Sequence, residues 1–246
     1  MASKKENGKL IKDWINKINV TRKIVEDFKI WVESPKNLKI LDVGSGNGGA
    51  SIAFAEAGAI VSGIELNERL VDIAKQFSKE YSVKPNFILY NGNRIPFQDN
   101  IFDAALSISV LEHVSDPINY LKEILRVLKP NRYLYLAFLN RLWPKETHPL
   151  LYFLHWLPYI VSSKLVKLFK HCPYEDNNLH FYTYWDLKNI IEQVGSEKEN
   201  LKIIEEKGKS KKITKKIIKK SLKMFGFSYK IFLPHIQLIL KKQSIK

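Results

Sequence analysis

A glycine-rich turn with a carboxylate on each side is the part of this sequence best suited to hold a ligand. Asp42 lies near the end of a short apolar segment, and Gly44-Ser45-Gly46-Asn47-Gly48 follows and opens a helical segment. Glycines allow a tight turn and a close approach of a ligand to the backbone. The start of the following helix adds free N–H groups. A turn that binds nothing could have the same glycines, so the flanking carboxylates decide the interpretation.

Two carboxylates narrow the choice of ligand. Glu65 ends the next apolar segment, where a carboxylate can accept hydrogen bonds from both hydroxyls of a ribose. NAD and S-adenosylmethionine both carry such a ribose, and Gly49 completes the pattern G-x-G-x-x-G of dinucleotide sites. Asp42 favours S-adenosylmethionine, because a charge near a buried strand end is costly unless it is used. It could receive the ammonium group of that cofactor, directly or through water, whereas an anionic pyrophosphate would be repelled.

Short apolar segments alternate with amphipathic ones around this turn, which is typical of a doubly wound α/β fold. We expect strands over residues 38–43, 60–65, 87–90, 102–108, 133–139, 201–205 and 235–240. We expect helices over residues 10–33, 50–57, 68–81, 116–128 and 184–194, the first of which could be two helices. Consecutive strand–helix units make parallel strands, and open α/β sheets bind ligands outside the carboxyl ends of such strands.

Five motifs in order resemble the class I S-adenosylmethionine-dependent methyltransferases, in the group that methylates small molecules. They are the 41–48 segment around the glycine turn, Asn91-Gly92-Asn93-Arg94-Ile95-Pro96-Phe97, the 99–107 segment, Val110-Leu111-Glu112-His113-Val114 and Leu125-Arg126-Val127-Leu128-Lys129-Pro130. The resemblance covers about residues 38–140, with a weaker similarity over 181–195. It implies one three-layer α/β/α domain over residues 1–246, with a Rossmann-like, mostly parallel seven-stranded sheet. It also implies the strand order 3-2-1-4-5-7-6 with the seventh strand antiparallel.

The resemblance further implies which residues bind S-adenosylmethionine. Glu65 would bind the ribose and Leu66 would pack on the adenine. The other implied cofactor residues are Asp42, Gly44, Ser45 and Gly46 at the methionine end, Asn91 and Gly92 at the adenine edge, and Ser107 and Ile108 at the end of the fourth strand. The family usually has Asp where Asn91 stands, but an amide oxygen can still accept a hydrogen bond from the adenine amino group.

Glu112 and His113 follow the fourth strand and are the candidates for chemistry. Methyl transfer needs the donor and the acceptor to be aligned, and an oxygen acceptor also needs a base or a metal. Histidine is suited to act as a base near neutral pH, although His113 could equally pack or orient its loop. Some relatives use Glu-x-x-Glu-His as a metal site. Ser109 stands at the first of these positions, so no metal is predicted, and the lone Cys172 excludes a disulfide and a Cys-based zinc site.

Three flanking segments surround the predicted sheet. Residues 1–36 would form a helical cap. Residues 141–180 are rich in aromatic residues and contain His148, His155, His171 and His180; insertions at this place cover the acceptor pocket in the resembling family. Residues 207–223 are dense in lysine, with isoleucines and a leucine at helical spacing, as in a basic helix that lies on an anionic membrane. A solvated face over ordinary core is the plain alternative.

The sequence therefore predicts a methyltransferase for a small-molecule or lipid- or glycan-linked acceptor. The net charge of +15 favours anionic partners, which keeps an RNA methyltransferase as an alternative, although no RNA-binding domain and no Asn/Asp-Pro-Pro-Tyr/Phe motif is recognisable. A non-catalytic S-adenosylmethionine-binding module and an NAD oxidoreductase are further alternatives. The polar start of the chain and the lysines within its most apolar stretch predict a cytoplasmic protein, with peripheral contact at the inner membrane surface as an option.

Overall fold

The computed structural model describes residues 4–32, 34–141, 182–196, 201–207 and 235–244, and also residues 161, 164, 168 and 180. The chain divides into two compact units. Residues 1–107 and 123–134 belong to the first unit, and residues 108–122 and 135–246 belong to the second. The single domain expected over residues 1–246 stays a prediction. The helical insertion predicted over residues 141–180 lies almost wholly outside the described residues, and so does the basic segment predicted over 207–223. His148, His155 and His171 also lie outside them.

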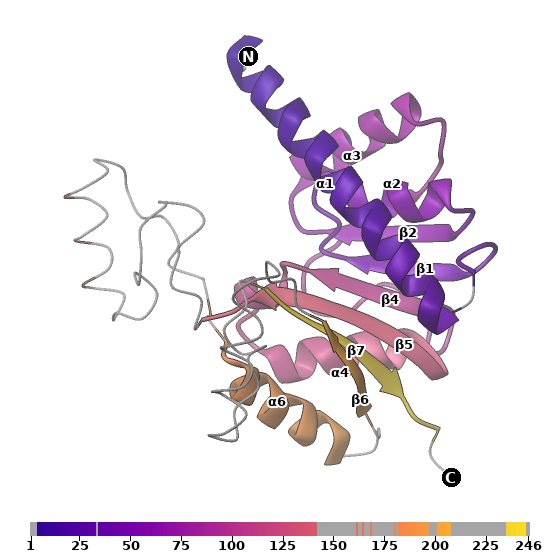
Figure 1. Cartoon of the computed structure of the whole chain (residues 1–246), viewed down its shortest axis with the longest axis vertical. Coiled ribbons are helices and arrows are strands. Elements are labelled where there is room, and N and C mark those ends of the chain that lie inside the picture. Colours follow the sequence, from indigo (N-terminus) through magenta and orange to yellow (C-terminus); the bar gives the residue numbers. More distant parts are fainter. Residues whose placement is uncertain are drawn as a thin grey trace, which may run out of the picture. The chain divides into compact units, whose positions relative to one another are not determined.

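The strands follow the order β3-β2-β1-β4-β5-β7-β6, which is the order that the resemblance implied (Figure 1). Their bounds are β1 Lys39–Val43, β2 Ile60–Glu65, β3 Asn86–Leu89, β4 Phe102–Ile108, β5 Leu128–Leu139, β6 Leu201–Lys207 and β7 His235–Lys242. β1 pairs in parallel with both β2 and β4, and β2 pairs in parallel with β3. β6 and β7 pair antiparallel. The predicted α/β fold class with a mostly parallel sheet is confirmed.

The helices differ from the expected ones mainly at their ends. They are α1 Lys4–Val32, α2 Gly49–Glu56, α3 Glu68–Glu80, α4 Pro117–Val127, α6 Tyr184–Ser196 and the short 3-10 helix η1 Leu111–His113. The N-terminal segment is one helix rather than two. Residues 130–131, which precede the strand expected over 133–139, lie inside β5, where Asn131 has φ 62°. Asn tolerates this left-handed conformation better than most residues, so the strand continues through it.

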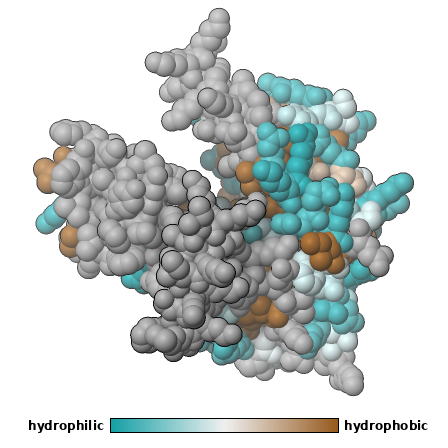
Figure 2. All heavy atoms as spheres, in the orientation of Figure 1, coloured by the Kyte–Doolittle hydropathy of each residue, from teal (hydrophilic) through white to brown (hydrophobic). Residues whose placement is uncertain are grey.

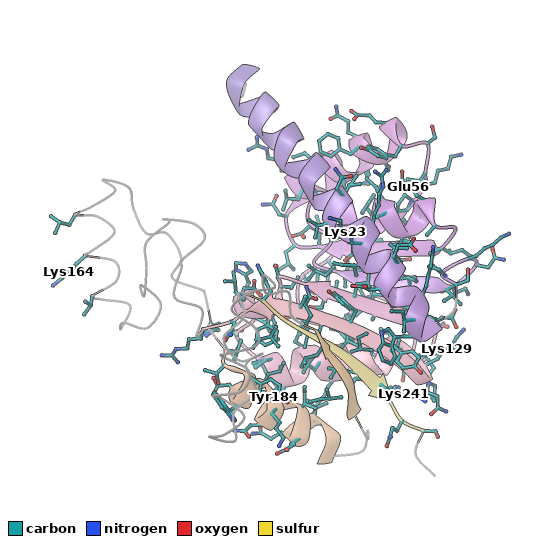
Figure 3. All side chains as sticks on the ribbon, viewed as in Figure 1. Lys23, Glu56, Lys129, Lys164, Tyr184 and Lys241 are labelled. Atoms are coloured by element: carbon teal, nitrogen blue, oxygen red, sulfur yellow. The ribbon has the colours of Figure 1, made fainter. Side chains whose placement is uncertain are left out.

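In the first unit, α1 packs on α2 through apolar side chains. The rings of Phe28 and Phe54 meet edge to face with their centroids 5.2 Å apart. Ile18 of α1 and Ile52 of α2 are buried together. Glu56, which lies at the end of α2 and is labelled in Figure 3, accepts hydrogen bonds of 3.0 and 2.9 Å from Arg22 of α1. The long N-terminal helix therefore covers the helix that follows the glycine turn.

In the second unit, α6 has an apolar face at helical spacing. Leu187, Ile190, Ile191 and Val194 are all buried. β6, which α6 contacts, pairs with β7, and β7 buries most of its residues, including Ile236, Leu238 and Leu240. α6 continues through Gly195 to Ser196, beyond the end expected at residue 194. Glycine lowers helix stability but does not stop a helix whose other residues are packed.

Exposed large hydrophobic side chains are spread over several elements of the described chain, among hydrophilic neighbours (Figure 2). Among these exposed side chains, Leu66 belongs to the predicted cofactor site. It directly follows β2 and is 59% exposed. Within the described ranges, no helix combines the length and the apolar character needed to span a bilayer. The predicted cytoplasmic location and peripheral membrane contact stay predictions.

Candidate cofactor site

The parallel register of the first unit brings the ends of its strands to one edge. Val43 of β1 stands beside Ile64 of β2 and Ser107 of β4. The glycine turn leaves the sheet directly after Val43, and the backbone N–H groups of Gly44 and Ser45 both donate to the Ile64 carbonyl, at 2.9 and 3.0 Å. The turn is thereby attached to the end of the neighbouring strand. This is the edge at which open α/β sheets bind ligands.

The glycines of the turn have different surroundings. Gly44, Gly46 and Gly48 all have positive φ, at 69°, 55° and 83°. A Cβ on Gly48 would lie 2.8 Å from Cβ of Ala74 and 2.9 Å from Cζ of Phe87, so internal packing requires glycine there. A Cβ on Gly46 would have no atom within 4 Å. The turn is therefore closed against the protein at Gly48 and open at Gly46, where a ligand has room to approach.

Glu65 ends β2 beside this open position. Its Oε2 accepts a hydrogen bond of 2.8 Å from the backbone N–H of Gly46. Its Oε1 accepts from the N–H groups of Leu66 and Asn67, at 2.8 and 3.1 Å. A carboxylate has about four acceptor positions, two on each oxygen. Oε1 uses both of its positions, so one position remains on Oε2, the oxygen that is hydrogen-bonded to the turn. Glu65 thus anchors the glycine turn and can still accept a further donor.

Asp42 lies behind the turn and is 2% exposed. Its Oδ2 accepts a 2.7 Å hydrogen bond from the Ser51 hydroxyl of α2. Burial raises the pKa of Asp42 to about 6, and the hydrogen bond from Ser51 only partly opposes that rise. This degree of burial favours an indirect contact, through water, with a ligand ammonium group. The Ser45 hydroxyl is also buried, and it has no hydrogen-bond partner among the described residues.

Leu66 and Gly92, the residues expected beside the adenine, lie close together. Gly92 has φ 81°, and a Cβ on it would lie 3.2 Å from Cδ2 of Leu66. The backbone just before each of them is also joined, because the N–H of Tyr90 donates to the Glu65 carbonyl at 3.0 Å. Asn91 is exposed, and its Oδ1 accepts from the Asn93 N–H at 3.2 Å. An amide oxygen has two lone pairs, so that Asn91 can accept a second donor.

The remaining candidates follow the end of the first unit. Ser107 is fully buried and Ile108 is half-buried. In the second unit, Glu112 is 2% exposed, and its Oε2 has no hydrogen-bond partner within the described ranges. Burial raises the pKa of Glu112 to about 7. His113 is exposed. No group of three or more His, Cys, Asp or Glu side chains suited to a metal ion occurs in the described part of the chain.

Comparison with known proteins decides the family. A family model described as a methyltransferase domain matches residues 41–136, which include the glycine turn, Glu65 and the segment after β3. This segment belongs to the methyltransferase domain family. Over this segment, the predicted likeness to the class I methyltransferases is therefore confirmed.

Relatives and solved structures extend the comparison beyond the matched segment. The chain is 30% identical over 144 residues to a protein named ubiquinone biosynthesis O-methyltransferase from Pelagibacter ubique, covering 56% of this chain and 60% of that one. The chain thus spans about three fifths of the length of this curated relative. The magnesium protoporphyrin IX methyltransferase of Synechocystis, solved with bound SAH, has a TM-score of 0.59 at 19% identity and covers 93% of this chain and 86% of that one. The [4+2]-cyclase SpnF has a TM-score of 0.62 at 19% identity, covering 93% and 82%. At these identities the two structures show the fold alone.

Sequence reasoning missed two residues that shape the methyltransferase domain. Ser51 binds Asp42, and its signal was a small polar residue in the otherwise apolar α2. Gly63 lies within β2, and a Cβ there would be 2.8 Å from Cδ1 of Phe87 and 2.9 Å from Cβ of Ser45. A glycine inside a strand often marks a close approach by another group. Ser51 thus contacts the residue two positions before the glycine turn, and Gly63 leaves room for Ser45 within the turn.

The raised pKa of Asp42 predicts how stability depends on pH. The folded pKa of about 6 lies above the ordinary value of 3.8, so this carboxyl contributes most to stability below pH 4, and that contribution is lost as pH rises through 6. Asp42→Asn should therefore raise the free energy of unfolding at pH 8, by an amount on the order of 3 kcal/mol at 1.4 kcal/mol per pKa unit. The gain should vanish near pH 4. Urea unfolding of both proteins at the two pH values measures this, and an Asn variant less stable than the wild type at pH 8 would contradict it.

Proposed function

We propose that this chain is a methyltransferase that uses S-adenosylmethionine and methylates a small molecule. The observation that carries the proposal is the open glycine turn at Gly46, hydrogen-bonded to the carboxylate of Glu65 in a segment of the methyltransferase domain family. A free turn position beside a ribose-binding carboxylate suits a nucleoside cofactor. Asp42 at the base of the turn favours S-adenosylmethionine over a dinucleotide, because only the former has an ammonium group.

The residues of the first unit fit this cofactor by their chemistry. Glu65 would accept a ribose hydroxyl at the remaining position of Oε2, the exposed side chain of Leu66 would cover one face of the adenine, and Asn91 would accept from the adenine amino group. The open position at Gly46 would admit the sugar and the amino-acid part, with Asp42 supplying a negative charge beneath them. When bound, the cofactor supplies an electrophilic methyl group on a sulfonium.

For the acceptor, we propose a hydroxyl group on a lipid-linked or glycan-linked small molecule. The support is the name of the relative from Pelagibacter ubique, an O-methyltransferase of ubiquinone biosynthesis. Glu112 and His113 remain the candidates for removing the proton of the hydroxyl. A buried carboxyl with a pKa of about 7, as burial gives Glu112, can exchange a proton near neutral pH.

Transfer of a labelled methyl group tests the proposed reaction. The full chain is incubated with S-adenosylmethionine labelled on its methyl group, together with a cell extract separated into lipids, other small molecules and RNA. We expect label in the lipid or small-molecule fraction, and a loss of at least about tenfold in Glu112→Gln if this group assists the proton transfer. Label in RNA alone would favour the RNA alternative. Tight cofactor binding without transfer to any fraction would favour a non-catalytic module, and both results would contradict the proposal.

A further inference from the structure

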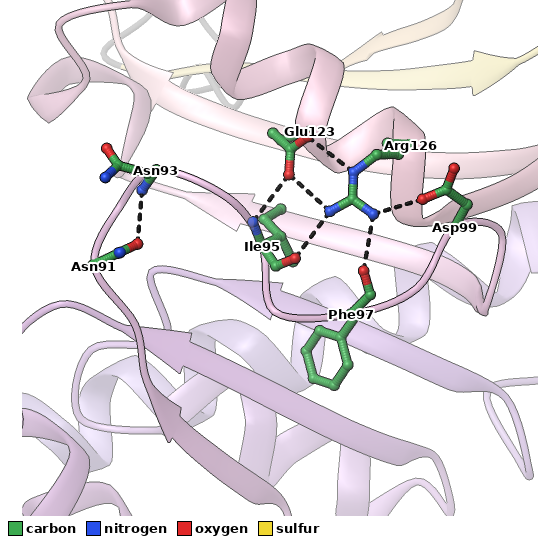
Figure 4. A network of polar contacts seen from close by, with 7 residues as sticks. All are labelled: Asn91, Asn93, Ile95, Phe97, Asp99, Glu123 and Arg126. Carbon is green, nitrogen blue, oxygen red and sulfur yellow. Dashed lines mark hydrogen bonds and ion pairs between the residues drawn. The ribbon is translucent and has the colours of Figure 1, made fainter.

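Arg126, near the end of α4, donates hydrogen bonds from every N–H of its guanidinium group (Figure 4). Nε donates to Glu123 Oε1 at 2.9 Å, and Nη2 donates to Glu123 Oε2 at 2.8 Å and to the Ile95 carbonyl at 2.9 Å. Nη1 donates to the Phe97 carbonyl at 2.8 Å and to Asp99 Oδ1 at 2.7 Å. These five residues, which we call the Arg126 cluster, all belong to the first unit.

The Arg126 cluster is well shielded from water. The side chains of Arg126 and Glu123 are 17% and 18% exposed, and only Asp99 is largely exposed, at 60%. Hydrogen bonding to Arg126 lowers the pKa of Glu123, so that the pair is held in its charged form. Two-pronged arginine–carboxylate pairs are strong and fix geometry as well as distance. The cluster is thus a rigid attachment point on α4.

This attachment point holds the segment between β3 and β4. Both backbone groups of Ile95 are fixed, because its N–H also donates to Glu123 Oε2 at 3.0 Å. The end of the segment is tied to α4 as well, through the Asn100 N–H and the Arg126 carbonyl at 3.0 Å. Residues 90–101 lie between β3 and β4 and contain neither helix nor strand. Its position therefore depends on such side-chain and backbone contacts.

The same segment begins with the residues at the expected adenine edge. Asn91 and Gly92 precede the anchored residue Ile95 by only a few positions, and Gly92 lies against the side chain of Leu66. A recognition segment that is fixed before binding loses less conformational entropy when the ligand arrives. Small displacements of hydrogen-bonding groups also weaken recognition, so that the supporting contacts matter as much as the contacting residues.

We propose that Arg126 is a positioning residue for the nucleoside end of the cofactor and acts through the segment 91–99. This inference rests on the proposed cofactor function. The amino-acid end of the cofactor would lie at the glycine turn, which is attached to β2 through the Ile64 carbonyl and the Glu65 carboxylate instead. Loss of Arg126 should therefore weaken binding of the nucleoside part, with or without the amino-acid part attached.

Calorimetric titration of the full chain tests this with two ligands, S-adenosylhomocysteine and 5′-methylthioadenosine, which lacks the amino-acid end. Arg126→Gln should weaken both ligands by about tenfold. Arg126→Lys should weaken both as well, since a lysine cannot reproduce the two-pronged pair with Glu123 or reach both backbone carbonyls. Arg22→Gln is the matched control, because it removes another two-pronged arginine–glutamate pair of the same unit, with Glu56. Its affinities should stay within about twofold of the wild type.

Each result decides for or against the positioning role. A merely structural Arg126 would lower the urea midpoint of unfolding while leaving both dissociation constants unchanged at low temperature, and that result would overturn the proposal. Should Arg126→Gln fail to fold, Asp99→Ala removes a single exposed contact of the cluster. We expect it to weaken both ligands severalfold, and an unchanged affinity would again overturn the proposal. A wild-type protein that binds neither ligand would instead refute the proposed cofactor function itself.

Discussion

Glu65→Gln is expected to weaken binding of S-adenosylhomocysteine by about ten- to a hundredfold. The remaining acceptor position on Oε2 would accept a ribose hydroxyl. A hydrogen bond to a charged group contributes about 1.5–3 kcal/mol, which corresponds to about ten- to a hundredfold in affinity. A glutamine side chain has one acceptor oxygen, so it cannot accept from Gly46 and from Leu66 at once, as Glu65 does. Isothermal titration calorimetry of the variant and the wild type measures the change.

The control for this experiment is Glu56→Gln. It makes the same chemical change in the same unit, at a carboxylate paired with Arg22 of α1. Its affinity should match that of the wild type. A Glu65 variant that binds within about threefold of the wild type would show that this carboxylate does not hold the ribose, because so small a change is under 1 kcal/mol.

Gly48→Ala should mainly lower stability, whereas Gly46→Ala should mainly weaken ligand binding. The alanine Cβ at position 48 would meet Ala74 and Phe87 at under 3.0 Å, with φ at +83°. Overpacking costs about 1–3 kcal/mol and a left-handed alanine about 1–2 kcal/mol, so the free energy of unfolding should fall by about 2–5 kcal/mol. The alanine at position 46 has open space around it and only the backbone cost. Urea unfolding compares the two variants.

The matched pair separates a packing glycine from a ligand-facing one. Gly46→Ala should remain folded and yet bind S-adenosylhomocysteine at least about tenfold more weakly, because its methyl group occupies the side from which the ligand approaches. If Gly46→Ala bound as tightly as the wild type, the ligand would not approach at Gly46. If Gly48→Ala were as stable as the wild type, the contacts at that position would not be restrictive.

Local sequence patterns predicted the framework of this protein well. β2 at residues 60–65 and β4 at residues 102–108 have the predicted bounds. Apolar runs bounded by glycine or by charged residues mark such buried parallel strands clearly. The place of the glycine turn follows from the same pattern, since it must leave β1 at the carboxyl edge. The predicted start of β5, at residue 133, was wrong. Pro130 and Asn131 favour a turn locally, but the strand begins at Leu128 and continues through them.

The different roles of similar residues could not be predicted, because they depend on contacts between distant parts of the chain. Gly46 and Gly48 look alike in the sequence, and only the approach of Ala74 and Phe87 makes one closed and the other open. Asp42 was singled out for its charge, but its bond to Ser51 depends on how α2 lies on β1. Arg126 belongs to one of the motifs that the sequence shows. Its hydrogen bonds to Ile95, Phe97 and Asp99 could not be predicted, because these residues are distant from it in the sequence.

The central claim is that the glycine turn and Glu65 bind S-adenosylmethionine and not a dinucleotide. The most direct test is calorimetric titration of the purified full chain with S-adenosylhomocysteine, with NAD titrated in parallel under the same conditions. We expect one site of micromolar affinity for S-adenosylhomocysteine, which Glu65→Gln weakens, and no heat of binding with NAD. Binding of NAD, or of neither compound, would contradict it.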